Sequence, residues 1–247
     1  MMRGSYIAVA LAASGSLFPQ VTSAQATTDP LETRVTVLRD GFVDAVKACG
    51  VEPAFVPAVS ISTDASVISY YRKTLIVGRW EELPPPIQGF ADAWAAQVMP
   101  GEGGQALYDR IFNGFLVGHE LGHWVGDWSG RWATLDRWDS EMEANRFAIA
   151  FAKLDPTTAA ELERTVAMFD FLHAGPGPTP AGEDERTYFD ENYETLATRD
   201  PIGYSWFQGR LMQLAWEQRD TADFCALVKL PPDTAGRNPD WSPRSGA

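Results

Sequence analysis

Histidine, lysine and cysteine are scarce in this sequence, and the lack of positive charge limits what the chain can bind. Its 247 residues include three histidines and two cysteines, and only four lysines: Lys47, Lys73, Lys153 and Lys229. Acidic side chains outnumber basic ones by 33 to 20, which argues against nucleic acid or anionic membrane surfaces as partners. Hydrophobic residues make up 45% of the chain, a share that excludes a disordered protein.

The first 26 residues have the pattern of a secretory signal peptide. Arg3 gives a short positive region, an apolar run follows, and small residues offer cleavage sites after Ala24 or Ala26. The apolar run is too short, and too rich in glycine and serine, for a membrane anchor. No later segment is long and apolar enough to span a membrane. We therefore predict export, to the periplasm or the medium, of a mature chain of residues 27–247.

Cys49 and Cys225 lie near the two ends of this mature chain. Export would bring them into an oxidising compartment, where a disulfide can form. The sequence does not show whether the two residues approach within bonding distance, so a disulfide and two free thiols both remain open.

Hydrophobic periodicity predicts a single α+β domain, with a small antiparallel sheet followed by a mainly helical part. Short runs of β-branched and aromatic residues predict strands at 59–63, 66–72 and 74–80. Helical spacing predicts helices at 31–49, 87–98, 107–125, 141–154, 156–172, 188–197 and 204–218. Residues 174–187 are predicted to form an exposed loop rich in glycine and proline, and 231–247 a tail.

Two of the three histidines lie four residues apart in the segment F-L-V-G-H-E-L-G-H-W-V, residues 115–125. Residues i and i+4 share one face of a helix, so His119 and His123 can aim two nitrogens at one zinc ion. Glu120 is rotated by about 100° around the helix, which places it beside the ion and suits a base acting on water. The helix is apolar nearly all round and therefore buried, where imidazoles and a glutamate without partners would be costly. We therefore predict that this segment binds Zn²⁺.

Other residues around this motif allow more than one interpretation. Gly114, Gly118 and Gly122 recur every four residues and would let another segment pack closely against the helix. The neighbouring tryptophans would line either the core or an apolar substrate pocket: Trp124, Trp128, Trp132 and Trp138. The strand T-L-I-V-G, residues 74–78, is either a core strand or one to which an extended peptide adds by strand pairing.

A catalytic zinc ion usually has three protein ligands, and the chain offers a carboxylate for the third. Eighteen residues after His123 comes E-M-E-A-N-R-F-A, residues 141–148. H-E-L-G-H followed by this sequence resembles the glutamate-zincin metallopeptidases. The resemblance is specific over about residues 110–152, and the order of elements is similar to that of a family of small secreted metallopeptidase-like proteins.

The resemblance implies a zincin-like fold in which Glu141 is the third metal ligand and Asn145 supports a ligand histidine. Glu143 is the competing choice, because that family usually has E-D-x-A-D where this chain has E-M-E-A-N. Glu141 and Asn145 share a helix face, as these two roles require, and this favours Glu141.

The function implied is zinc-dependent hydrolysis of a peptide or protein substrate, with Glu120 as the general base. A further donor to the carbonyl oxygen of the substrate is expected from one of Tyr188, Tyr193, Tyr204 and His173. One alternative is a non-catalytic zinc-binding recognition module of the same fold, against which the intact Glu120 argues. The other is an exported interaction protein in which the motif is coincidental.

Overall fold

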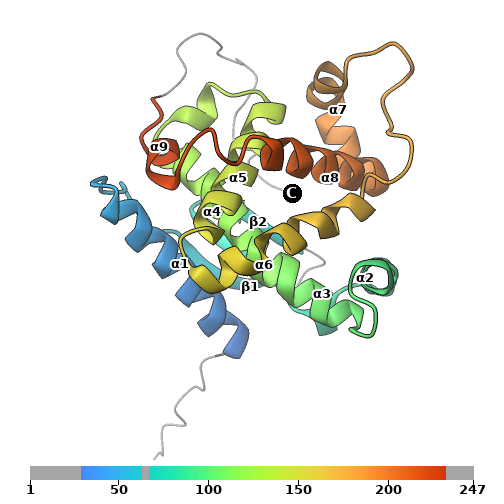
Figure 1. The fold of residues 1–247 in the computed structure, drawn as a ribbon, viewed down its shortest axis with the longest axis horizontal. Helices are drawn as coiled ribbons and strands as arrows, with labels where there is room; N and C mark the ends of the chain where they lie inside the picture. The colour runs from blue at the N-terminus through green and yellow to red at the C-terminus, as the bar shows by residue number, and fades with distance from the viewer. Residues whose placement is uncertain (1–28, 63–66, 232–247) are drawn as a thin grey trace, which may run out of the picture.

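A computed structural model describes residues 29–62 and 67–231 of the chain (Figure 1). The predicted signal peptide, and all but the first residue of the predicted tail, lie outside these residues. Within them the predicted α+β class is confirmed: one three-stranded sheet accompanies a much larger helical part. No helix of the described residues has both the length and the apolar character needed to cross a membrane.

The first helix, α1 (Pro30–Ala48), begins and ends at recognisable signals. The Asp29 side chain accepts a hydrogen bond from the Leu31 N–H, and Pro30 occupies the first helical position. The helix ends before Cys49 and Gly50, and Gly50 has a left-handed backbone. The buried face of α1 includes Val35 and Phe42, which pack into the main hydrophobic cluster.

The sheet is mixed rather than antiparallel, which corrects the predicted pairing. Its strands are β1 (Ala58–Ser62), β2 (Ile68–Tyr71) and β3 (Thr74–Gly78), in the order β1-β3-β2. β2 and β3 form an antiparallel hairpin, whose two-residue turn holds Arg72 and Lys73 at positive φ. β1 pairs with β3 in parallel. Because β3 has a partner on each side, it offers no free edge to a peptide, and it is a core strand.

The helix predicted at 107–125 is longer and is interrupted. After α2 (Pro85–Val98), α3 (Gly104–Arg110) leads through a π-helical turn, Ile111–Phe115, into α4 (Leu116–Trp128). Such turns are rare and occur frequently at functional sites. α4 is buried on nearly all sides, as its composition predicts.

The remaining predicted helices are present, although the one predicted at 156–172 is α-helical only to Ala167 and ends in a 3-10 turn, Met168–Phe171. They are α5 (Arg137–Ala152), α6 (Pro156–Ala167), α7 (Glu185–Arg199) and α8 (Pro201–Glu217). The loop predicted at 174–187 ends earlier, because the Asp184 side chain accepts from the Thr187 N–H and starts α7. A short helix, α9 (Phe224–Val228), was not predicted.

Two hydrophobic clusters meet at α4 and α5. The first contains buried side chains of α1, the sheet, α4 and α9, including Phe42, Trp124 and Phe224. The second joins α2, α7 and α8 to the other face of α5, including Phe189 and Phe207. α4 and α5 therefore lie in the middle of the molecule (Figure 1), and side chains between them are shielded from solvent.

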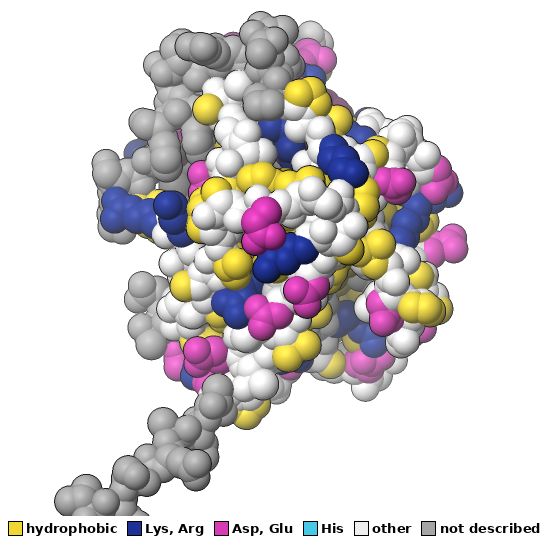
Figure 2. Space-filling model, turned by 90° about the vertical axis from the view of Figure 1, so that its left-hand side faces the viewer, with side chains coloured by type: hydrophobic (Ala, Val, Ile, Leu, Met, Phe, Trp, Pro, Cys, Tyr) yellow, Lys and Arg dark blue, Asp and Glu magenta, His cyan; other side chains and the backbone are white. Residues whose placement is uncertain are grey.

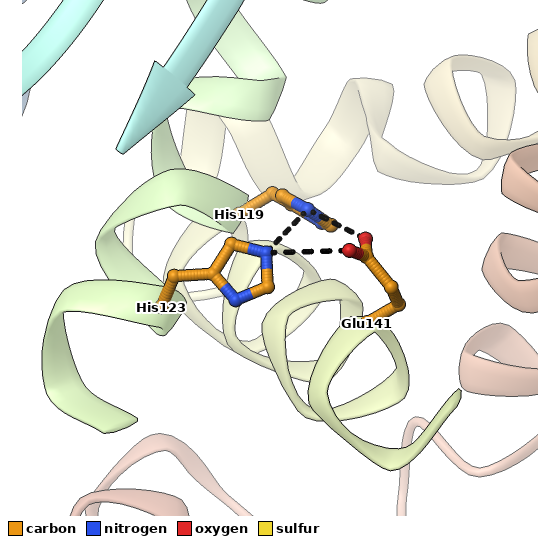
Figure 3. Close-up of side chains that lie close together, drawn as sticks. All are labelled: His119, His123 and Glu141. Atoms are coloured by element: carbon orange, nitrogen blue, oxygen red, sulfur yellow. Dashed lines mark hydrogen bonds and ion pairs between the residues drawn. The ribbon is translucent and has the colours of Figure 1, made fainter. Parts of the chain in front are cut away.

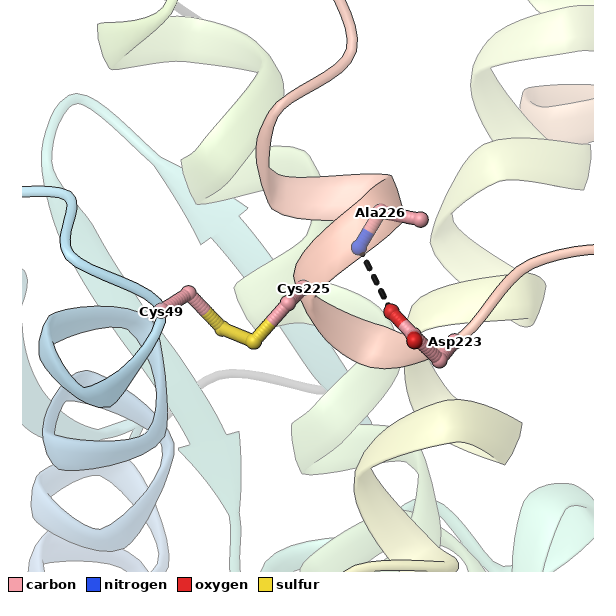
Figure 4. The surroundings of a disulfide bond; sticks show 4 residues. All are labelled: Cys49, Asp223, Cys225 and Ala226. Atoms are coloured by element: carbon pink, nitrogen blue, oxygen red, sulfur yellow. Dashed lines mark hydrogen bonds between the residues drawn. A yellow bond between two sulfur atoms is a disulfide. The ribbon is translucent and has the colours of Figure 1, made fainter.

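A disulfide joins Cys49, directly after α1, to Cys225 in α9 (Figure 4). The two Cα atoms are 5.2 Å apart. Beside it the Asp223 side chain accepts a hydrogen bond from the Ala226 N–H and starts the short helix. The open question from the sequence is thus answered in favour of the disulfide.

The face of the molecule that carries α1 has no single sign of charge. Figure 2 shows basic and acidic side chains interspersed there, with hydrophobic side chains between them. Exposed charges of the described residues also form pairs, among them Lys47 with Glu52 and Lys153 with Asp220. Pairs as exposed as these contribute little to stability.

The glycines of α4 allow α5 to approach closely. A Cβ atom at Gly118 would lie 3.2 Å from the Cα of Ala148, and one at Gly122 only 2.8 Å from the Cα of Ala144. Gly118 and Gly122 therefore serve the packing of α5, whereas Gly114 lies in the π-helical turn, where a Cβ would meet the Asp109 carbonyl. The close approach also brings Glu141 and Asn145, which α5 carries, near α4.

Replacing Gly122 by alanine is expected to lower the free energy of unfolding by about 1–3 kcal/mol, because the new methyl group meets backbone that cannot move alone. Chemical denaturation measures the change. The matched control is Gly89→Ala in α2, where a Cβ meets nothing within 4 Å. That substitution should be neutral or stabilising by up to about 1 kcal/mol. Equal stabilities for the two variants would contradict the close approach of α4 and α5.

Candidate metal centre

α4 brings the two histidines of the motif together on its buried face. The rings of His119 and His123 are 4.8 Å apart and nearly perpendicular. Their Nε2 atoms are only 3.2 Å apart (Figure 3). The predicted convergence of the two imidazole nitrogens is therefore present in the structure.

α5 adds the Glu141 carboxylate to this pair. Its Oε2 lies 3.3 Å from the Nε2 of His119, and its Oε1 lies 3.8 Å from the Nε2 of His123. One potential ligand atom from each of the three residues lies within 4.8 Å of the other two. Glu143 does not join them, because its carboxylate forms an ion pair with Arg131 at 3.0 Å. Of the two glutamates considered from the sequence, the structure thus places Glu141 beside the histidines.

The donor set fits a small divalent cation. Tetrahedral ligands at about 2.0–2.2 Å from a zinc ion lie about 3.3–3.6 Å from one another. The observed separations of 3.2, 3.3 and 3.8 Å are close to this range. Two imidazoles and a carboxylate are also a ligand set used by catalytic zinc. This group could therefore hold a metal ion.

Burial and mutual charge set the protonation of these groups. Burial opposes the charged form of His119, but the hydrogen bond and charge of Glu141 outweigh it and raise the pKa of His119 to about 9. Burial lowers the pKa of His123 to about 4. Burial also disfavours the charged form of Glu141, yet its histidine neighbours bring the pKa of this carboxyl down to about 2. Glu141 is therefore ionised at neutral pH, as a metal ligand must be.

Asn145, one turn after Glu141 on α5, contacts the far side of His119. Its Oδ1 lies 2.8 Å from the Nδ1 of His119, and the side chain is buried. An acceptor at Nδ1 fixes the proton there and leaves Nε2 free to bind a metal. This is the arrangement that the resemblance implies for Asn145.

Two side chains from the C-terminal helices hold the Glu141 carboxylate. The Tyr193 hydroxyl of α7 donates to Oε1 at 3.2 Å, and the Gln208 amide of α8 donates to Oε2 at 3.2 Å. Gln208 was not recognised in the sequence. It lies 67 residues from Glu141, in no motif, and only the packing of α8 on α5 brings the two together.

The four side chains considered as donors to a substrate oxygen divide into two groups. Tyr193 contacts Glu141, and Tyr204 packs against Tyr193 with ring centres 5.9 Å apart. Burial and the charge of Glu141 raise the pKa of Tyr204, which keeps its hydroxyl protonated. Tyr188 instead stacks on Phe207. His173 lies beside Trp206. The structure therefore brings Tyr193 and Tyr204 to the centre and places the other two elsewhere.

The Glu120 carboxylate reaches the sheet and also lies close enough to His119 and Glu141 to interact with their charges. Its Oε2 accepts a hydrogen bond of 2.7 Å from the backbone N–H of Tyr70 in β2. Burial raises the pKa of Glu120 to about 7, although this hydrogen bond and the charge of His119 oppose the rise. A buried carboxyl with a pKa near neutrality can both accept and release a proton.

All four tryptophans near the motif belong to the two hydrophobic clusters or pack against them, and Trp132 also contacts a histidine of the candidate site. Trp124 is fully buried, with Trp128 beside it. Trp138 packs against Phe189 in the second cluster. Trp132 stacks on the ring of His123, with centroids 5.3 Å apart and an interplanar angle of 19°.

Comparisons of the chain with protein-family models, with curated proteins and with solved structures found no match. The chemistry of this site must therefore be inferred from its own residues. These residues are His119, His123 and Glu141, with Glu120 on the same helix turn as the histidines.

Proposed function

We propose that the protein is a zinc-dependent peptidase of the glutamate-zincin type, with His119, His123 and Glu141 as the metal ligands. The convergence of these three donors within 4.8 Å carries the proposal. A bound zinc ion supplies a Lewis acid that polarises the carbonyl of the scissile bond and acidifies water. A peptide or protein is the proposed substrate, and a non-catalytic zinc-binding module is the competing function.

Glu120 acts as the general base in this proposal. Its carboxylate takes a proton from the attacking water and returns it to the leaving amine. The Tyr70 N–H holds Oε2 by the 2.7 Å hydrogen bond, so the orientation of the carboxylate is fixed before substrate binds. A structural metal site has no use for such a base, which argues for hydrolysis over recognition alone.

Tyr193 and Tyr204 are the candidates for a donor to the carbonyl oxygen as negative charge develops on it. Both are protonated at neutral pH, since burial raises the pKa of each phenol above its usual value. Tyr193 also holds Glu141. A phenol has one proton to donate, so Tyr193 could donate to a substrate only by releasing Glu141, whereas Tyr204 has no such bond to Glu141 among the hydrogen bonds described above.

Export is part of the proposal. The Cys49–Cys225 disulfide is of the kind that persists in oxidising compartments. The predicted signal peptide, residues 1–26, would direct the chain to export, so the mature chain would act in the periplasm or outside the cell.

Metal removal tests the function directly. The mature chain is incubated with a peptide library as purified, after treatment with a chelator, and after addition of one equivalent of Zn²⁺. We expect cleavage to be lost with the metal and restored by zinc but not by Mg²⁺, which prefers oxygen ligands. A purified chain that contains and takes up no zinc would contradict the proposal. Cleavage that survives complete metal removal would contradict it as well.

A further inference from the structure

His123 lacks a partner of the kind that His119 has in Asn145. Its Nδ1 instead faces a hydroxyl: the Oγ of Ser140 lies 3.4 Å away. Ser140 is in the first turn of α5, one residue before Glu141, and only 7% of it is exposed. The two ligand histidines therefore have different neighbours on the same helix.

The position of the Ser140 oxygen is fixed by Trp132. The indole Nε1–H of Trp132 donates to Ser140 Oγ at 2.7 Å. The same indole stacks on the His123 ring. One residue therefore supports both the face of this imidazole and the atom that its Nδ1 meets.

Trp132 itself lies in a turn that a buried ion pair holds in place. The turn, Arg131–Ala133, follows α4 directly. The Arg131 guanidinium, which is buried, donates to Glu143 through Nε and Nη2 and to the Leu230 carbonyl through Nη1. Glu143 thus has a role in the fold: it anchors the turn that carries Trp132.

We propose that Ser140 and Trp132 are positioning residues for His123, an inference that rests on the proposed metal site. A histidine that binds metal through Nε2 carries its proton on Nδ1 and needs an acceptor there. A serine hydroxyl has two lone pairs. One takes the Trp132 N–H, and the other faces the Nδ1 of His123. The pair thereby directs Nε2 of His123 toward Nε2 of His119 and the Glu141 carboxylate.

Two substitutions separate this role from general packing. Ser140→Ala removes the acceptor, and Trp132→Phe removes the N–H but keeps an aromatic ring over His123. Each should weaken the affinity for Zn²⁺ alone, measured by competition with a chromophoric chelator, by about 10-fold to 100-fold. Because both side chains act through the Ser140 oxygen, the double variant should lose little more affinity for Zn²⁺ than the single variant that binds it more weakly.

Two matched controls use the same chemical changes away from His123. Ser129→Ala removes a hydroxyl whose hydrogen bond goes to the Gly126 carbonyl. Trp138→Phe alters an indole that packs on Phe189 and Phe207. Both variants should bind Zn²⁺ within about twofold of wild type, because the hydrogen bond of Ser129 and the ring contacts of Trp138 go to residues that are not proposed metal ligands.

Nitrogen-15 spectra provide a readout that a purely structural role would not change. The chain has three histidines, so labelled imidazoles can be assigned one by one. In the zinc-loaded wild type the Nδ1–H protons of His119 and His123 should both exchange slowly with solvent. Ser140→Ala should speed exchange at His123 alone, since His119 keeps its hydrogen bond with Asn145.

The outcomes distinguish this inference from the proposed function. Unchanged Zn²⁺ affinity and unchanged exchange at His123 in both variants would overturn the positioning role while leaving the peptidase proposal intact. A wild type that binds zinc but cleaves no peptide would contradict the peptidase proposal alone. If Ser140→Ala fails to fold, Ser140→Thr and Trp132→Phe decide the question. Ser140→Thr keeps the hydroxyl and should retain the affinity for Zn²⁺, whereas Trp132→Phe should weaken it.

Discussion

Replacement of Glu120 by glutamine is expected to lower kcat for peptide hydrolysis by about 100-fold to 10,000-fold while zinc binding is retained. Glutamine has the shape of glutamate but cannot take a proton from water. Its amide oxygen can still accept the hydrogen bond from the Tyr70 N–H, so the local structure should persist. The three proposed metal ligands do not include this residue, and the affinity for zinc should change little.

Steady-state kinetics on a peptide found in the library, together with the zinc content of both proteins, measures this effect. The matched control is Glu52→Gln, the same chemical change at a side chain that is 79% exposed. It should leave kcat unchanged. A Glu120→Gln variant as active as wild type would rule out the assigned base. A wild type that binds zinc and cleaves nothing would favour the recognition module instead.

Loss of the disulfide is expected to lower the free energy of unfolding by about 5 kcal/mol. Cys49 and Cys225 are 176 residues apart in the sequence, and the chain-entropy treatment of a loop of that length gives this value. The crosslink stabilises the fold mainly by reducing the conformational entropy of the unfolded chain. A loss of this size is a large fraction of the stability of a typical domain.

Urea denaturation of the wild type and of the double variant Cys49→Ala, Cys225→Ala measures the effect. Wild type unfolded in the presence of a reductant is the matched control, because it lacks the crosslink without a change of sequence. The two should unfold at similar urea concentrations, both well below oxidised wild type. Identical midpoints for oxidised and reduced wild type would show that the crosslink contributes nothing to stability.

The residues of the candidate metal site could be predicted from the sequence to different degrees. His119, Glu120 and His123 are fixed relative to one another by a single helix turn, so their arrangement follows from local geometry. The choice between Glu141 and Glu143 depends on Arg131 and on how α5 faces α4. The helix face that Glu141 shares with Asn145 already favours Glu141 in the sequence, and the ion pair with Arg131 shows where Glu143 points instead.

Other parts of the structure depend on contacts between distant residues that no local pattern in the sequence indicates. Strand positions follow from composition, but the order β1-β3-β2 depends on how the chain crosses the sheet. The hydrogen bond that orients Glu120 comes from the backbone of Tyr70, and a backbone donor is the same in every residue except proline. Gln208 and Ser140 are ordinary polar residues in sequence, and tertiary packing alone brings them to the ligands.

The cluster shared by α1 and α9 sets an order of events during synthesis. Phe42 packs on Phe224, with ring centres 5.0 Å apart, so α9 can cover its part of α1 only once the chain has passed residue 224. Contacts between such distant positions form slowly, because the loop between them must first be ordered. Trp124 of α4 and Phe147 of α5 also pack on Phe42, and these contacts can form while α9 is still being made, so the short C-terminal helix joins the cluster last.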